Sequence, residues 1–138
     1  MCDIPKIKTR RVFISHRWNR LKEEYYSIRE KLNSLKYFKY RDYSVPPNKR
    51  LEANTELGLK RKLTRKLKQV SSVIVPASFS IYHSEWKKYE LERAKKLGKP
   101  IIALKRKGQK RIPRIIKKYA DAIVTRKDKL KKVIRRLY

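Results

Sequence analysis

The sequence predicts a three-layer α/β protein, in which a five-stranded parallel sheet carries helices on both faces. Short apolar runs rich in strand-forming residues alternate, five times along the chain, with segments whose apolar residues recur at helical spacing. The 138 residues include only three glycines and no low-complexity linker, so they fit a single domain. Strands that alternate with helices in this way are typical of a parallel sheet covered on both sides.

The predicted strands are the five apolar runs. RRVFIS forms the first strand, YFKYRDYSV a second and more exposed one, and VSSVIVPAS the third, which ends near Pro76. The full set comprises residues 10–15, 37–45, 70–78, 100–105 and 121–124. Residues 1–9 are expected to form a flexible N-terminal segment before a single domain of residues 10–138.

The predicted helices follow from apolar residues three and four positions apart. Leucines recur every four residues from Leu59 to Leu67, for example. The helix after the third strand begins near His83 or Ser84 and ends at LGKP, where Gly98 is suited to the C-cap region. The helical segments are residues 21–35, 59–70, 83–97, 112–120 and 130–137.

The natural order for five such strands is the flavodoxin-like 2-1-3-4-5, although spacing along the chain does not determine it. This order places a ligand crevice at the carboxyl ends of the first and third strands. The two segments there are SHRWN, residues 15–19, and PASFSIYHSEW, residues 76–86. Two polar loops rich in aromatic residues therefore converge, and Glu90 lies in the helix that follows.

The charge of the chain is extreme: 41 lysines and arginines against 12 acidic residues give a net charge of +29. No acidic residue occurs from Leu57 to Ser84 or from Arg93 to Ala120. Such a surface attracts polyanions, including nucleic acid, acidic protein and acidic lipid. A lysine-rich, thermophilic host proteome would explain the same composition. The run of residues 60–68 is most simply a solvated helix face, with nucleic-acid contact as the alternative.

Several classes of protein are excluded by what the sequence lacks. A single cysteine, Cys2, allows no intrachain disulfide. No apolar run has the length of a signal peptide core or of a membrane span. A cytoplasmic protein without membrane contact is therefore expected. Two histidines are too few for a convincing zinc site, and no metal is expected. The absence of a glycine-rich phosphate loop disfavours dehydrogenases and NTPases.

Glu90 raises a question, because helical spacing places it on an apolar face. That face comprises Trp86, Glu90, Ala94 and Leu97. One interpretation is a surface carboxylate that pairs with Arg93 or Lys87, which contributes a few tenths of a kcal/mol. The other is a carboxylate that faces a site in need of negative charge.

These motifs resemble those of TIR-like domains, and more closely the TIR-like proteins of Thoeris antiviral systems and their archaeal relatives. RRVFISHRWN is similar to the first-strand signature of the family, and Ser84-x-Trp86-x-x-x-Glu90 is similar to its S-x-W-x-x-x-E motif. RDYSVP and KRIPRII also resemble the Thoeris branch, and the similarity covers residues 10–138. Lys87 is a departure, because plant and animal relatives often have cysteine there.

The resemblance implies cleavage of the nicotinamide–ribose bond of NAD, by hydrolysis or by cyclisation to a cyclic ADP-ribose isomer. NAD is then the substrate, and no cofactor is expected. By the match of motifs, Glu90 is the catalytic carboxylate and Ser84 and Trp86 frame it. The loop beside the nucleotide corresponds to Ser15, His16, Arg17 and Trp18.

The chemistry is compatible with one carboxylate. Nicotinamide leaves a cationic ring as a neutral molecule, so the paired carboxylates of ordinary glycosidases are unnecessary. Glu90 would stabilise the positive charge that develops on the ribose, while Arg17 and the helix N-terminus near Ser84 would neutralise the pyrophosphate. Each residue also has a plainer role: Trp86 in core packing, Ser15 in a turn or cap.

The resemblance also implies partners: other copies of the chain through TIR–TIR contacts, and a separate effector that responds to the nucleotide product. Two alternatives stay open. One is a catalytically silent interaction module whose basic surface binds nucleic acid or an acidic protein. The other is a nucleoside deoxyribosyltransferase-like enzyme, which needs a second carboxylate that the strand ends do not supply.

Overall fold

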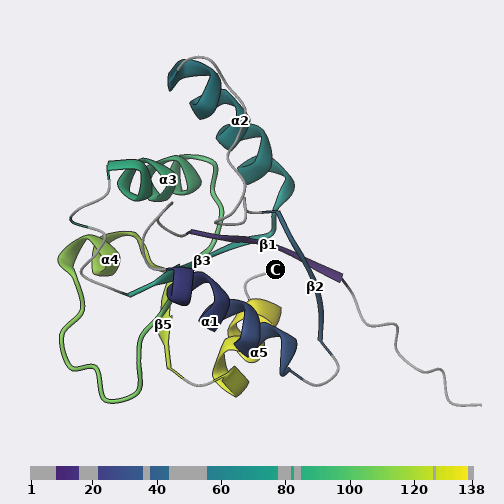
Figure 1. Cartoon of the computed structure of the whole chain (residues 1–138), viewed down its shortest axis with the longest axis vertical. Helices are drawn as coiled ribbons and strands as arrows, with labels where there is room; N and C mark the ends of the chain where they lie inside the picture. The colour runs from purple at the N-terminus through teal and green to yellow at the C-terminus, as the bar shows by residue number, and fades with distance from the viewer. Residues whose placement is uncertain are drawn as a thin grey trace, which may run out of the picture.

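The computed structural model contains one parallel sheet of five strands in the order β2-β1-β3-β4-β5, with helices on both of its faces (Figure 1). The predicted three-layer fold and strand order are confirmed. The structure describes residues 9–15, 22–35, 38–43, 56–77, 82, 85–125 and 127–136. Nearly all of the N-terminal segment predicted to be flexible, and all of Cys2, lie outside these residues.

Strands and helices alternate along the chain as the apolar patterns predict. The strands are β1 (Thr9–Ile14), β2 (Lys39–Asp42), β3 (Ser72–Pro76), β4 (Ile101–Leu104) and β5 (Ala122–Val124). The helices are α1 (Lys22–Asn33), α2 (Glu56–Gln69), α3 (Glu85–Lys96), α4 (Arg114–Tyr119) and α5 (Lys127–Arg136). β2 is shorter than the predicted residues 37–45, of which 37, 44 and 45 lie outside the described part of the chain.

The two faces of the sheet bury alternate residues of each strand, as the period of two in a strand requires. One face packs against α2, α3 and α4 through Leu67, Leu91 and Ile116. The other packs against α1 and α5 through Leu32 and Ile134. β3 and β4 are buried along their whole length, because helices cover both sides of them.

The carboxyl ends of the central strands lie at one edge of the sheet. In the parallel ladder of β1 and β3, Ile14 pairs with Ile74, and the backbone N–H of Ser15 donates to the carbonyl of Ile74 over 2.8 Å. Ser15 is therefore the first residue beyond β1, directly beside β3. α3 starts at the same edge and runs back over the sheet, so its first turns lie above these strand ends (Figure 1).

Local backbone geometry ends α3, and a side-chain hydrogen bond joins β4 to β5. Gly98, with φ of 71°, occupies the left-handed region just after α3, as expected for a residue that ends a helix. The Asp121 carboxylate accepts a hydrogen bond of 2.7 Å from the backbone N–H of Ile101, which joins the start of β5 to the start of β4. None of the described helices combines the length and apolar character that a membrane span requires.

Candidate functional site

The site is built around a buried hydrogen bond between β1 and α3. The hydroxyl of Ser15 donates to Oε2 of Glu90 over 2.6 Å, although 75 positions separate the two residues in the sequence. Ser15 is 0% exposed and Glu90 is 3% exposed. A hydroxyl that donates to a carboxylate has this short distance, and a carboxylate out of contact with water requires such donors. The bond therefore holds Glu90 at the edge where the crevice was predicted.

The phase of α3 explains why Glu90 faces inward. Lys87, Glu90, Leu91 and Ala94 recur at spacings of three and four, and all four are buried. Leu91 and Ala94 pack in the apolar cluster that α2, α3 and α4 share with the sheet. Packing of these two residues thus orients the carboxylate, because they fix the rotation of the helix about its axis.

This face adds one residue to the predicted stripe and excludes one alternative. Of the predicted stripe, Glu90 and Ala94 are buried, and Lys87 is buried with them. The side chain of Trp86 lies outside the described residues. The interpretation of Glu90 as a surface carboxylate is wrong, since its residue is almost fully buried. Arg93, one of its two proposed partners, donates instead from Nε to Oγ1 of Thr64 in α2 over 3.3 Å.

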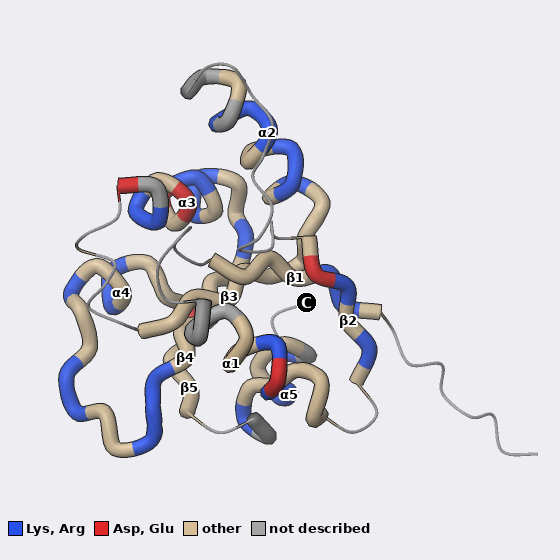
Figure 2. Tube along the Cα trace, in the orientation of Figure 1, with Lys and Arg blue, Asp and Glu red and all other residues tan. Residues whose placement is uncertain are grey.

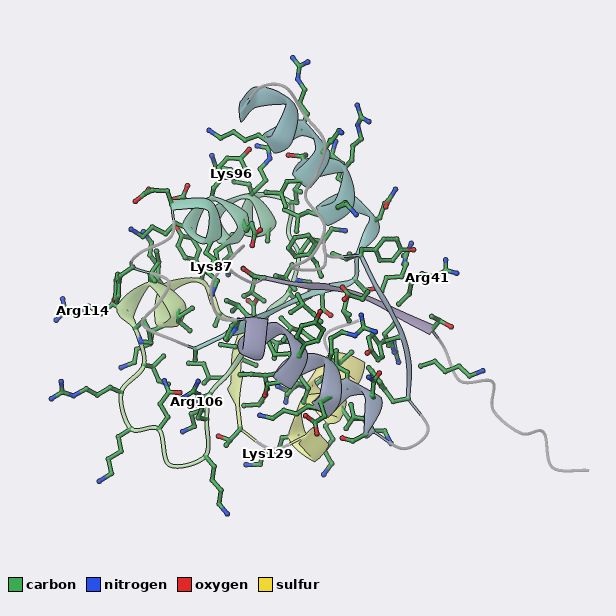
Figure 3. All side chains as sticks on the ribbon, viewed as in Figure 1. Arg41, Lys87, Lys96, Arg106, Arg114 and Lys129 are labelled. Carbon is green, nitrogen blue, oxygen red and sulfur yellow. The ribbon has the colours of Figure 1, made fainter. Side chains whose placement is uncertain are left out.

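Lys87 is a second buried charged residue on this face of α3, and its burial was not predicted from the sequence. It is 1% exposed, and Figure 3 places it on the side of α3 that faces the sheet. Residues three apart on a helix have Cβ atoms about 5–6 Å apart, so its side chain starts close to that of Glu90. A fully buried lysine is rare without a partner or a role. The signal in the sequence was its position three residues before Glu90.

The other predicted site residues cannot be placed with this pair. His16, Arg17, Trp18 and Ser84 lie outside the described residues. The backbone of Trp86 belongs to the first turn of α3, but its side chain is not described. The structure thus brings together Ser15 and Glu90, and their proposed neighbours remain predictions.

The described residues of the site are suited to the stabilisation of positive charge. Within the described ranges, no group of three or more His, Cys, Asp or Glu side chains is arranged to hold a metal ion. A buried carboxylate acts strongly on any positive charge nearby, because little water screens the interaction. Such an arrangement can stabilise a cationic sugar at the edge of the sheet.

A comparison with protein families finds a match over most of the chain. The model described as Thoeris protein ThsB, TIR-like domain, matches residues 13–111, which include both Ser15 and Glu90. A search of the curated proteins finds no match to the sequence.

Solved structures with the same fold share little sequence with this chain. A conserved protein from Enterococcus faecalis V583 is 10% identical, with a TM-score of 0.65 over 95% of this chain and 100% of that chain. A 2-deoxyribosyltransferase from Bacillus psychrosaccharolyticus is 14% identical, with a TM-score of 0.61 over 88% and 90% of the two chains. The CMP N-glycosidase BcmB from Clostridium botulinum is 15% identical, with a TM-score of 0.51 over 93% and 98%. At these identities the similarity establishes the fold alone.

Proposed function

The chain belongs to the family of TIR-like domains of the Thoeris protein ThsB, and from this membership we propose that it cleaves the nicotinamide–ribose bond of NAD. Glu90 is the proposed catalytic carboxylate. The observation that carries the proposal is the buried bond of 2.6 Å between Ser15 and Glu90 at the carboxyl ends of the central strands. Parallel α/β proteins of this strand order bind their ligands at that edge.

In the proposed reaction, the bond between the ribose anomeric carbon and the ring nitrogen breaks, and its electron pair goes to nicotinamide. The positive charge moves from the ring to the ribose, where the carboxylate of Glu90 stabilises it. Water then attacks the anomeric carbon and loses a proton, which gives ADP-ribose. Attack by a nucleophilic group of the same nucleotide would give a cyclic product. The leaving group departs neutral, so one carboxylate suffices.

The activities for which two similar structures are named support a substrate of the nucleoside class. One names a 2-deoxyribosyltransferase and the other a CMP N-glycosidase, both on the fold of this chain. Ser84, Trp86 and residues 15–18 are the proposed contacts to the nucleotide. Self-association through TIR–TIR contacts, a downstream effector, a role in antiviral defence and a cytoplasmic location complete the proposal.

Incubation of the purified protein with NAD, followed by chromatography of the nucleotides, tests this function. Wild-type protein is expected to release nicotinamide, and the second product distinguishes hydrolysis from cyclisation. Glu90→Gln keeps the size of the side chain but removes its charge, so turnover should fall by about 10²-fold or more. The measurement is repeated over a range of protein concentrations, because self-association would complete the active assembly.

Glu92→Gln is the matched control, since Glu92 lies on the same helix and is exposed. It removes the same charge and should leave turnover unchanged. Equal turnover by wild type and Glu90→Gln would refute the role of Glu90, and absence of nicotinamide release at every concentration would refute the enzyme. Thermal unfolding of each variant identifies any loss that results from misfolding.

A further inference from the structure

The loop between β4 and α4 gathers cations on an ordered backbone. Lys105–Arg111 and the start of α4 contain no acidic residue. The exposed members are Arg106, Lys107, Lys110, Arg111 and Arg114. In Figure 1 the loop extends away from the sheet, Figure 2 shows its lysines and arginines, and Figure 3 labels Arg106 and Arg114 on the same side of the molecule.

Gln109 fixes this loop through both ends of its amide. Its Oε1 accepts a hydrogen bond of 3.0 Å from the backbone N–H of Arg106. Its Nε2 donates to the carbonyls of Ala77 over 2.6 Å and of Arg111 over 2.8 Å. Gly108, with φ of 82°, permits the tight turn between these anchors. The cations are therefore presented by a preordered loop, which lowers the entropy that binding would cost.

An exposed aromatic ring accompanies the cations. Tyr82 is 42% exposed, and its hydroxyl accepts a hydrogen bond of 2.9 Å from the backbone N–H of Arg114. This bond holds the ring beside the first residue of α4. A cationic surface with an exposed aromatic ring matches the combination that single-stranded nucleic acids bind, with phosphates on the cations and a base stacked on the ring.

We propose that Arg106, Lys107, Lys110, Arg111, Arg114 and Tyr82, here called the β4–α4 surface, bind single-stranded nucleic acid. Neither an acidic protein nor a lipid headgroup requires a ring in a fixed position. The proposal does not depend on NAD cleavage. It assigns part of the charge of +29 to a defined surface.

Fluorescence anisotropy with a labelled oligonucleotide of about 12 nucleotides, a length within the range of known single-strand sites, measures the binding. Wild-type protein is expected to bind the single strand more tightly than a duplex of equal length. Replacement of Arg106, Lys107 and Lys110 by glutamine should lower the affinity at least tenfold and reduce the slope of log K against log salt by about 2, since each lost phosphate contact contributes about 0.7.

A matched variant tests whether binding depends on the β4–α4 surface or on the net charge of the whole chain. Lys129, Lys132 and Arg136 are exposed on α5, which covers the opposite face of the sheet from α4. Their replacement by glutamine removes the same three charges and should leave affinity within about twofold, because no phosphate contact is lost. An equal loss of affinity in the two triple variants would overturn the proposal, as would the absence of binding by wild type at physiological salt.

Two neutral substitutions test the ring and the order of the loop. Tyr82→Ala should weaken binding of the single strand about tenfold. Gln109→Ala keeps the net charge, so it should weaken binding without changing the salt slope. The proposal would be overturned if both variants bound the single strand with wild-type affinity. It would also be overturned if the wild-type protein bound the duplex, or vesicles of anionic lipid, more tightly than the single strand. Thermal unfolding of every variant confirms that the fold is retained.

Discussion

At the scale of single residues, the pairing of Ser15 with Glu90 is the contact on which the candidate site depends. Helical spacing in the sequence placed Glu90 on the apolar face of its helix and left open whether its carboxylate points outward; the structure shows the residue almost fully buried. Two roles were predicted for Ser15, in a turn or beside the nucleotide. Neither anticipated a direct bond to Glu90, because nothing along the chain links residues so far apart.

Removal of this hydroxyl should be costly for both stability and turnover. Ser15→Ala leaves a buried carboxylate with one donor fewer, so the free energy of unfolding should fall by about 2 kcal/mol, the usual range for a bond to a charged group. Denaturant unfolding measures this change, and NAD turnover is expected to fall in parallel.

A double-mutant cycle tests the origin of that effect. If the bond is responsible, Ser15→Ala combined with Glu90→Gln should destabilise the protein by clearly less than the sum of the two single changes. Strict additivity would mean that the two side chains stabilise the fold independently.

At the scale of elements, the inward face of α3 includes a residue that the sequence did not predict. The predicted stripe comprised Trp86, Glu90, Ala94 and Leu97. The structure buries Lys87 on the same face as Glu90 and Ala94. A stripe on a helix spans about 100°, so two adjacent residues can both be assigned to it. Packing against the sheet decides which positions of the helix are buried, and a long side chain such as lysine can enter a buried position that a hydropathy pattern assigns to solvent.

β3 offers a contrasting serine. Ser72 is 1% exposed, and its hydroxyl is one of the buried side-chain groups in the described part of the chain for which no partner is found. An unsatisfied buried hydroxyl costs stability, so Ser72→Ala should raise the free energy of unfolding by about 1 kcal/mol. Denaturant unfolding of the Ser72→Ala and Ser15→Ala variants compares the two positions. The free energy of unfolding is expected to rise in Ser72→Ala and to fall in Ser15→Ala. A loss of stability in Ser72→Ala would indicate a partner for this hydroxyl.

At the scale of the whole molecule, charge opposes the compact state. With 41 basic and 12 acidic residues, most cations have no anion to pair with. Among the described residues, ion pairs join Arg29 to Asp42 at 3.1 Å and Lys95 to Asp121 at 3.4 Å. Aromatic rings also accommodate cations: Nζ of Lys60 lies 4.8 Å from the centre of the Tyr89 ring.

Added salt should therefore stabilise the protein. Repulsion between exposed cations is screened as the Debye length falls from about 14 Å at about 50 mM to about 4 Å at about 500 mM salt. The midpoint of thermal unfolding, followed by circular dichroism, should rise across this range. A falling midpoint would mean that attractive ion pairs contribute more than repulsion.

The sequence alone determined the fold class, the alternation of strands and helices, and the position of Glu90 on the apolar face of its helix. These properties depend on periodicity and local propensity, which act over a few residues and are visible in the chain. The tertiary structure decided what depends on contact between distant segments: the bond from Ser15 to Glu90, the burial of Lys87, and the anchoring of the β4–α4 loop to the end of β3 through Gln109. Such contacts arise only when packing of the sheet and helices sets the distance between side chains, and no pattern along the sequence specifies that distance.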